Sequence, residues 1–197
     1  MKGHSANADG APTDHTQVNG LILTGGHSTR MGTDKSMLVY HDVPQREHLF
    51  RLLANYCTSV FISCRNDQDV PKELNPIRDS FHIQSPLNGI LSAFQYKPDV
   101  AWLAVAVDMP FVDAHAIERL LRHRDRSSVA TCYFNTQRQH PEPLLTVWES
   151  IAYPLLLKFA ESGNVSPREF LQTHGARLIE PPDEKTLINV NHPGDLH

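Results

Sequence analysis

The chain passes from an apolar segment into a glycine-containing loop in the stretch LILTGGHSTRMGTDK, residues 21–35. The segment Val18–Leu23 has the length and the branched side chains of a buried β-strand. The dipeptide Gly25-Gly26 then leaves backbone N–H groups open to close approach by a ligand. The same loop carries two fixed cations, Arg30 and Lys35. Exposed N–H groups with Arg and Lys at a strand end suit a polyphosphate, so we expect a nucleoside triphosphate to bind here.

This loop differs from two common phosphate-binding motifs. A Walker A loop has a glycine directly before its lysine, whereas Gly32-Thr33-Asp34 precedes Lys35. The glycines also lack the G-x-G-x-x-G spacing, which weakens a dinucleotide-binding interpretation. Taken alone, the two adjacent glycines are equally typical of an ordinary turn flanked by surface cations.

The composition is that of a globular protein. The chain has 197 residues, of which 40% are hydrophobic and 20% charged, so we expect one domain over residues 18–197. Residues 1–17 lack the apolar core of a signal peptide and are predicted to be a disordered leader or a cloning remnant. The net charge of -4 argues against a general nucleic-acid binder, and no apolar run approaches transmembrane length. Three cysteines without a C-x-x-C pair make disulfides and zinc unlikely and favour the cytoplasm.

Apolar patterns along the rest of the chain alternate between strand-like and helix-like segments. We expect further strands at residues 58–63, 77–80, 102–107, 129–134, 143–148, 177–180 and 187–190. Helices are expected after Pro44, after a capping Asp113, and at residues 90–96, 150–161 and 167–173. Such alternation predicts an α/β fold, a Rossmann-like three-layer α/β/α arrangement around a mostly parallel sheet.

A second candidate feature is Asp108, which ends the apolar run Trp102–Val107. Ligands of parallel sheets bind beyond the carboxyl ends of the strands, so Gly25 and Asp108 should border one crevice. A carboxylate in that position can hold Mg²⁺, with water and phosphate oxygens completing the coordination shell. The alternative is an ordinary turn or cap aspartate before Pro110.

Taken whole, residues 23–35 resemble the signature of nucleotidyltransferases of the molybdenum cofactor guanylyltransferase family. They match the pattern Leu-x-Gly-Gly-x-Ser-x-Arg-Met-Gly-x-Asp-Lys, and only Thr24 departs, where the family usually has a small alanine. The segment VAVDMPF, residues 105–111, resembles the metal-binding strand end of that family. The resemblance implies a glycosyltransferase-A-like nucleotidyltransferase fold and Mg²⁺ on Asp108. It also implies nucleotide contacts at Leu23, Thr24, Gly25, Gly26, Lys35 and Asp108.

The resemblance extends to the nucleobase side of the site. Asp79, in the segment IRDS, stands where the family has a carboxylate that recognises guanine; a plain turn aspartate is the alternative. Residues 86–90 resemble the segment Gly-Pro-Leu-x-Gly, with Ser85 in place of the first glycine and Gly89 free for close approach at a helix start. The family often has an asparagine near the base or ribose, whereas this chain has Ser63, so GTP and CTP both stay open.

Three further residues are expected on the acceptor side. The segment NVNHPGDL, residues 189–196, resembles the family's closing Asn-x-Asn-Thr-Pro-x-Asp-Leu pattern. Asn189 and Asn191 would point to one side of an extended segment and orient metal-bound phosphates, although Asn191 could instead cap a helix. His140 stands where family members have a His-Pro segment lining the acceptor; a surface histidine is the alternative.

The resemblance implies Mg²⁺-dependent transfer of GMP from GTP to the phosphate of molybdenum-molybdopterin, with release of pyrophosphate. Arg30, Lys35 and Asp108 would act by positioning and electrostatics, without a protein nucleophile or general base. The alternatives are a cytidylyltransferase on the same pterin, a nucleotidyltransferase for sugar or polyol phosphates, and a non-catalytic nucleotide-binding partner. The expected partners are GTP, a molybdopterin-type acceptor and, in transient contact, other proteins of molybdenum cofactor biosynthesis; nucleic acid and membranes are not expected.

Overall fold

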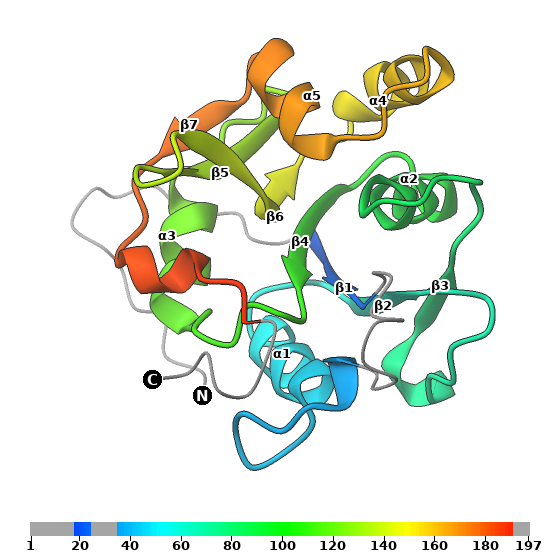
Figure 1. The fold of residues 1–197 in the computed structure, drawn as a ribbon, viewed down its shortest axis with the longest axis vertical. Helices are drawn as coiled ribbons and strands as arrows, with labels where there is room; N and C mark the ends of the chain where they lie inside the picture. Colours follow the sequence, from blue (N-terminus) through cyan, green and yellow to red (C-terminus); the bar gives the residue numbers. More distant parts are fainter. Residues whose placement is uncertain (1–17, 25–34, 191–197) are drawn as a thin grey trace, which may run out of the picture.

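The computed structural model describes residues 18–24 and 35–190, which form one seven-stranded sheet in the order β3-β2-β1-β4-β6-β5-β7 (Figure 1). The strands are β1 (Val18–Leu23), β2 (Val60–Cys64), β3 (Pro76–Arg78), β4 (Ala101–Ala106), β5 (Ala130–Asn135), β6 (His140–Trp148) and β7 (Arg177–Ile179). Strand β6 runs antiparallel to both β4 and β5, and the other neighbouring strands pair in parallel. The expected α/β fold with a mostly parallel sheet is therefore confirmed.

Five α-helices and three short 3₁₀ helices accompany the sheet in the described residues. The α-helices are α1 (Gln45–Leu53), α2 (Leu87–Tyr96), α3 (Ala114–Arg122), α4 (Ala152–Glu161) and α5 (Pro167–Thr173). The 3₁₀ helices are η2 (Lys35–Met37), η3 (Lys72–Leu74) and η4 (Glu184–Leu187). None of these helices is long and apolar enough to cross a membrane.

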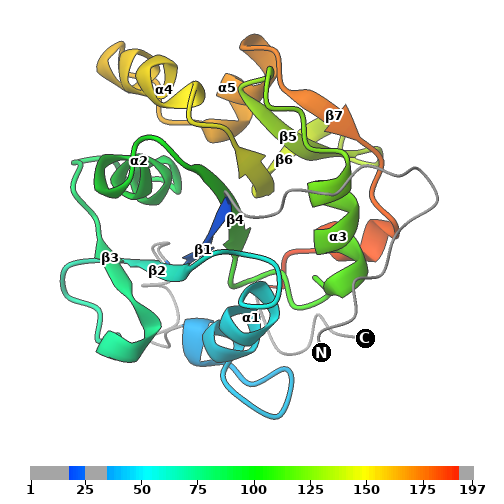
Figure 2. The same ribbon diagram turned by 180° about the vertical axis from the view of Figure 1, so that it is seen from behind.

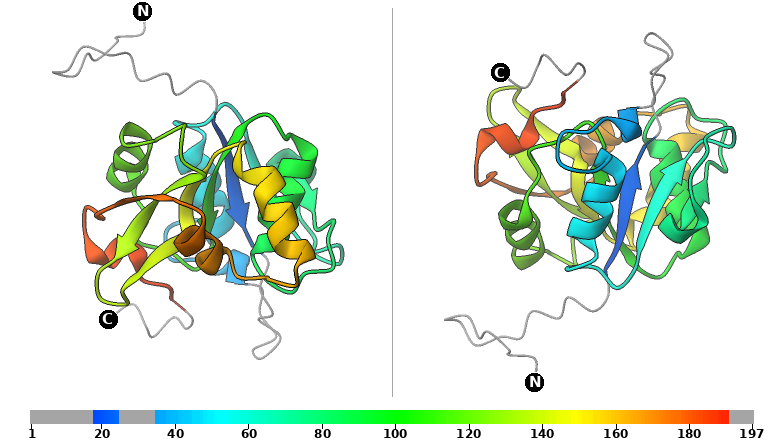
Figure 3. Two further views of the ribbon diagram at one scale, coloured as in Figure 1. Left: turned by 90° about the horizontal axis from the view of Figure 1, so that it is seen from above. Right: turned by 90° about the horizontal axis from the view of Figure 1, so that it is seen from below.

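The helices cover both faces of the sheet. Helices α1 and α3 lie on one face, and α2, α4 and α5 lie on the other, as the opposite views of Figures 2 and 3 show. Between these layers every residue of β1 and β4 is buried, because a strand covered on both faces can be apolar along its whole length. The ring of Phe94 in α2 stacks on that of Tyr153 in α4, with 5.4 Å between centroids, and joins two helices of one layer.

Helix α3 illustrates how local sequence sets the element boundaries. The side chain of Asp113 accepts a hydrogen bond from the Ala116 amide at 2.9 Å, which confirms the expected N-cap. The apolar stripe of α3 is buried, comprising Ile117, Leu120 and Leu121. A cap and a stripe are short-range signals, so they can be recognised without knowledge of the tertiary structure.

Three expected boundaries are wrong. Residues 187–190 were expected to form a strand, but Asp183 caps the 3₁₀ helix η4, which ends at Leu187. The helix expected at residues 90–96 starts earlier, because α2 begins at Leu87. The strand expected at residues 143–148 also starts earlier, because β6 begins at His140 and pairs with β5 from its first residue. In each case a short-range hydrogen bond, and not the apolar pattern, sets the boundary: Asp183 caps η4, Ser85 accepts from Leu87 N, and Asn135 pairs with His140 across a hairpin.

A buried ion pair joins the end of α3 to the end of β6. The Arg124 guanidinium donates two hydrogen bonds to the Glu149 carboxylate, at 2.6 and 2.8 Å, and the two side chains are only 10% and 5% exposed. A bidentate pair of this kind satisfies both charges, whereas loss of one partner leaves the other charge buried without compensation.

We therefore expect Glu149→Gln to lower the free energy of unfolding by about 3 kcal/mol or more, because Arg124 stays buried without a counter-ion. Urea denaturation measures this change. The matched control is Glu47→Gln, which removes the largely exposed pair with Arg51 on α1 and should change stability by less than about 0.5 kcal/mol. Equal effects of the two substitutions would contradict the importance of the buried pair.

Candidate active site

The carboxyl ends of the parallel strands β1 to β4 meet along one edge of the sheet. Backbone hydrogen bonds continue this alignment past the strand ends: Thr24 N donates to Ser63 O at 3.2 Å, and Val107 N donates to Leu23 O at 3.2 Å. Asp79 N donates to Cys64 O at 3.0 Å in the same way. Residues far apart in sequence are thereby brought side by side, at the edge where such sheets bind ligands.

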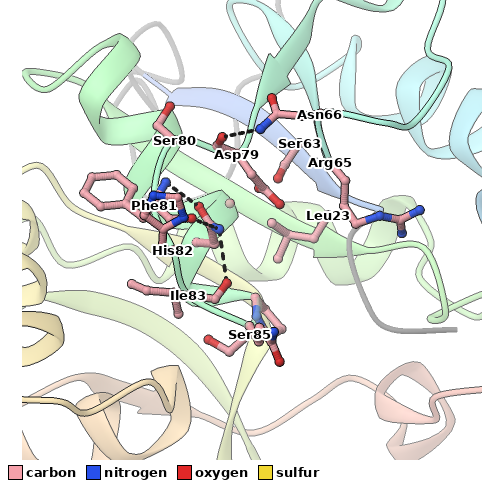
Figure 4. A pocket seen from close by; sticks show the side chains of 14 residues that line it. Leu23, Ser63, Arg65, Asn66, Asp79, Ser80, Phe81, His82, Ile83 and Ser85 are labelled. Carbon is pink, nitrogen blue, oxygen red and sulfur yellow. Dashed lines mark hydrogen bonds between the residues drawn. The ribbon is translucent and has the colours of Figure 1, made fainter. Parts of the chain in front are cut away.

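A cavity of about 750 Å³ opens at this edge, between the ends of β1, β2 and β3 and the start of α2 (Figure 4). Four of the expected nucleotide-binding residues line it, namely Leu23, Ser63, Asp79 and Gly89. Further lining residues escaped the sequence analysis, among them Arg65, Asn66, Phe81, His82 and Asn88. Apart from Asn88, which lies in the first turn of α2, they belong to loops whose path only the tertiary structure decides, although an Arg-Asn pair directly after a strand is a weak signal of a site.

Asp79 is half-buried in this cavity, directly after β3. Burial raises the pKa of its carboxyl group above the usual range, and the charge of Arg65 opposes that shift. The side-chain amide of Asn66 donates to the backbone carbonyl of Asp79 at 3.3 Å and so fixes the position of the residue. An ionised carboxylate held in this way can accept two parallel hydrogen bonds from a planar ligand.

Gly89 lies where α2 comes closest to the strand ends. A Cβ atom at this position would come within 2.9 Å of Leu23 Cδ2 and would overlap Ser63 Oγ. Gly89 therefore allows a close approach at the start of a helix, as expected. The approach is between α2 and the ends of β1 and β2. A glycine is needed here because any side chain would push the helix away from the cavity wall.

Two polar side chains hold the cavity wall formed by residues 81–86. The amide of Asn88 donates to the carbonyls of Phe81 and Ile83, at 2.6 and 3.1 Å. The Ser85 hydroxyl donates to Val165 O at 2.6 Å and accepts from Leu87 N at 3.2 Å. Ser85, which stands where the resemblance implied a glycine, thus accepts a hydrogen bond from the first residue of α2 and ties the wall to the segment between α4 and α5.

Asp108 lies two residues beyond β4 at the same sheet edge, and the C-terminal segment reaches it. Val190 N donates to the backbone carbonyl of Asp108 at 2.7 Å, which brings Asn189 next to the end of β4. Oδ1 of Asn189 is buried and accepts no hydrogen bond from the described residues. Carboxylate and amide oxygens are the ligands that hard divalent cations take, so this pair fits a magnesium ion.

Within residues 18–24 and 35–190, no three His, Cys, Asp or Glu side chains gather into a metal site of their own. A cation beside Asp108 would therefore take its remaining ligands from water and from phosphate oxygens of a substrate, as Mg²⁺ commonly does. Asp108 does not line the cavity. The cavity and the Asp108–Asn189 pair are therefore separate parts of the site along the same edge of the sheet.

The start of β6 reaches the same edge because this strand runs antiparallel to β4. His140, half-buried at the first position of β6, has Nδ1 3.0 Å from its neighbour Pro141 O. Glu142 is buried, and burial raises the pKa of its carboxyl group; a hydrogen bond from the Leu144 amide opposes that rise. His140 thus belongs to a strand end at the candidate site, whereas its role toward an acceptor stays a prediction.

Several expected site residues lie outside the described residues: Gly25, Gly26, Arg30 and Asn191. The backbone of Lys35 opens η2, but its side chain is also outside the description. The expected convergence of the glycine loop and its cations on Asp108 therefore stays a prediction. Thr24, the last described residue before this loop, lies beside Ser63 at the strand ends.

Comparison with known proteins places this geometry in a family. The family model described as "MobA-like NTP transferase domain" matches residues 20–178. The chain belongs to the MobA-like NTP transferase family. This match covers β1 to β7 almost completely and includes both the cavity and Asp108.

Curated relatives of this MobA-like protein carry names from molybdenum cofactor biosynthesis. The chain is 36% identical to a molybdenum cofactor biosynthesis bifunctional protein of Synechocystis, over 94% of this chain and 54% of the relative. It thus spans about half the length of that relative. It is 27% identical to a molybdenum cofactor guanylyltransferase of Histophilus somni, with 92% of this chain and 95% of the relative covered.

Solved structures show the same fold. Molybdopterin-guanine dinucleotide biosynthesis protein A from Archaeoglobus fulgidus superposes with a TM-score of 0.74 at 20% identity, covering 90% of this chain and 94% of that one. A 2-C-methyl-D-erythritol 4-phosphate cytidylyltransferase from Thermus thermophilus reaches 0.66 at 13% identity, covering 89% and 94%. At these identities the likeness concerns the fold, and it confirms the nucleotidyltransferase architecture.

We expect Gly89→Ala to lower the free energy of unfolding by about 1–3 kcal/mol, because the new methyl group overlaps Ser63 and Leu23. This loss would outweigh the gain in helix propensity that alanine normally brings. Chemical denaturation measures it. The double variant Ser63→Ala/Gly89→Ala removes the hydroxyl overlap and should recover part of the loss; a single variant as stable as the wild type would refute the tight contact.

Proposed function

We propose that this protein transfers GMP from GTP to the phosphate of a molybdopterin-type acceptor, with release of pyrophosphate. The observation that carries the proposal is the pairing, along one sheet edge, of a cavity holding Asp79 with the strand end holding Asp108. In a MobA-like NTP transferase with this pairing, the cavity would hold the nucleobase and the end of β4 would hold the phosphates. The names of the relatives from Histophilus and Synechocystis supply the acceptor class.

The chemistry of Asp79 favours guanine over cytosine. Guanine presents two adjacent N–H donors, on N1 and on its 2-amino group, which match the two oxygens of one carboxylate. Cytosine presents one amino donor beside a ring nitrogen acceptor, and this acceptor would face a carboxylate oxygen unfavourably. The cavity has room for a base on this side, and Asn66 holds the Asp79 backbone from the opposite loop.

The second part of the proposal concerns charge. The acceptor phosphate and the nucleotide are both anions, so their repulsion must be reduced before they can meet. Asp108 and Asn189 would hold Mg²⁺, and the bound ion would neutralise phosphate charge and stabilise the leaving pyrophosphate. Arg30 and Lys35 would add fixed positive charges on the phosphates.

No general base is needed in this scheme. A phosphate monoester is already ionised near neutral pH, so its oxygen can attack the α-phosphorus directly. The chain's own contribution is to hold the base through Asp79, to keep the nucleotide in line with the acceptor, and to neutralise charge. The acceptor side would be formed by the start of β6, where His140 lies, together with Asn189 and Asn191.

A nucleotide panel tests the proposal. With Mg²⁺ present, GTP should raise the melting temperature more than CTP, ATP or UTP, and GTP should support pyrophosphate release with a molybdopterin-type acceptor. Asp108→Asn should abolish the release while the circular dichroism spectrum stays unchanged. Asp99→Asn, an exposed aspartate before the opposite end of β4, is the matched control and should retain activity. A clear CTP preference would overturn the guanylyl assignment, and full activity of Asp108→Asn would remove the metal assignment.

A pH prediction follows from the raised pKa of Asp79. As the pH falls through that pKa, the carboxyl group gains a proton and can no longer accept two hydrogen bonds from guanine. GTP affinity should therefore decrease on acidification, starting at a higher pH than an exposed aspartate would give. Isothermal titration across the range from pH 7.5 to about pH 5 measures it. The Asp79→Asn variant is the control, because the pH dependence that it keeps comes from titration of the nucleotide itself. If GTP affinity had the same pH dependence in this variant as in the wild type, base recognition by Asp79 would be contradicted.

A further inference from the structure

The hydroxyl of Thr24 makes contacts that an alanine at this position could not make. This hydroxyl donates to the carbonyl of Ser63 at 2.7 Å and lies 3.0 Å from Oε1 of Gln68, a second acceptor. Both Thr24 and Gln68 are only 7% exposed. The sequence resemblance implied an alanine at position 24, so this hydroxyl is a feature of the present chain that the family pattern does not explain.

The contact with Gln68 anchors one side of the loop formed by residues 65–69. A second anchor comes from β3, where Arg78 Nη1 donates to Arg65 O at 2.8 Å and to Gln68 O at 2.5 Å. A third comes from α1, where the buried Arg46 donates to Asp69 O at 3.2 Å. The loop is thus held from three elements, and Thr24 supplies the anchor from β1.

This loop forms one wall of the nucleobase cavity. Arg65 and Asn66 line the cavity, and the side chain of Asn66 donates to the backbone carbonyl of Asp79, the interaction drawn as a dashed line in Figure 4. Gln68 follows Asn66 by two residues. The backbone N–H of Gln68 donates to Arg65 O at 3.2 Å, which closes a tight turn over residues 65–68. A shift at Gln68 would therefore move Asn66, and with it the restraint on Asp79.

We propose that Thr24 and Gln68 are positioning residues for base recognition, acting through the 65–69 loop on Asn66 and Asp79. The proposal rests on the proposed function, because it assumes that Asp79 receives the base. Removal of the hydroxyl takes away the contact of Thr24 with Gln68 Oε1, and the loop loses its anchor to the end of β1. Recognition of the base should suffer, whereas binding of the phosphates should not.

Inosine triphosphate is the probe that isolates this effect. It differs from GTP only by lacking the 2-amino group. The ratio of the GTP affinity to the inosine triphosphate affinity therefore reports how well Asp79 is placed. General destabilisation lowers both affinities together and leaves the ratio unchanged. A loss of position lowers the affinity for GTP more than that for inosine triphosphate and brings the ratio toward one.

The experiment measures both dissociation constants by isothermal titration, with Mg²⁺, for the wild type and six variants. Thr24→Val removes the hydroxyl at nearly constant volume and should weaken GTP binding about five- to tenfold, the effect of one net hydrogen bond, with the ratio lowered in parallel. Thr24→Ser keeps the hydroxyl and should retain the wild-type ratio. Asp79→Asn sets the ratio expected when recognition is lost.

The matched control is Thr131→Val in β5, where an equally buried hydroxyl accepts from the Asp125 amide near the opposite edge of the sheet. It should leave the ratio unchanged even if stability falls. Gln68→Leu should lower the ratio in the same direction as Thr24→Val, and the double variant should lower it by less than the sum of the two single effects, since both substitutions remove the Thr24–Gln68 contact.

The outcomes separate the two proposals. A wild type that does not distinguish GTP from inosine triphosphate would overturn recognition by Asp79 and, with it, the positioning role. A wild type that distinguishes them, together with a Thr24→Val variant of unchanged ratio, would leave the proposed function intact and overturn only the positioning role. Fully additive effects of Thr24→Val and Gln68→Leu would also overturn it, because independent losses exclude a shared contact.

Discussion

Parallel pairing of β1 with its neighbours is the constraint on which the candidate site depends. Because β1, β2, β3 and β4 run in one direction, their carboxyl ends lie along one edge, and single backbone hydrogen bonds extend this alignment past the strands. Val107 is thereby fixed against Leu23, and Thr24 against Ser63. The antiparallel β6 adds its own beginning to the same edge, so a chemically mixed set of residues meets there.

Polar side chains then shape this edge by binding backbone groups of the loops. Asn66 holds Asp79, Asn88 holds the segment at Phe81 and Ile83, and Ser85 reaches the segment between α4 and α5. Loops that carry unpaired backbone groups are unfavourable when buried, so each of these bonds both satisfies the backbone and fixes the cavity wall. Residues that depart from the family pattern, such as Ser85 and Thr24, contribute to this network instead of disturbing it.

Much of the fold could be predicted from local patterns. The apolar runs of β1 and β4, the cap and stripe of α3, and the start of α5 at Pro167 are signals contained within a few residues. The errors fall where hydrogen bonds, and not apolar periodicity, set a boundary: Asp183 caps η4, which already contains Leu187, and β6 begins early because its first residue pairs with Asn135 of β5. The cavity shows a similar limit, since Arg65 and Asn66 carry only a weak local signal that they line a site.

The sequence by itself determined the fold class, the family resemblance and the residue types that can carry charge or accept a base, because motifs and periodicity are local properties. Only the tertiary structure decided which of these residues share a site. It put Ser63, Asp79 and Gly89 around one cavity, moved Asn189 next to Asp108, and linked Thr24 to Gln68. The physical reason is that strand register and loop anchoring depend on hydrogen bonds between segments distant in sequence, and no short stretch of residues encodes such bonds.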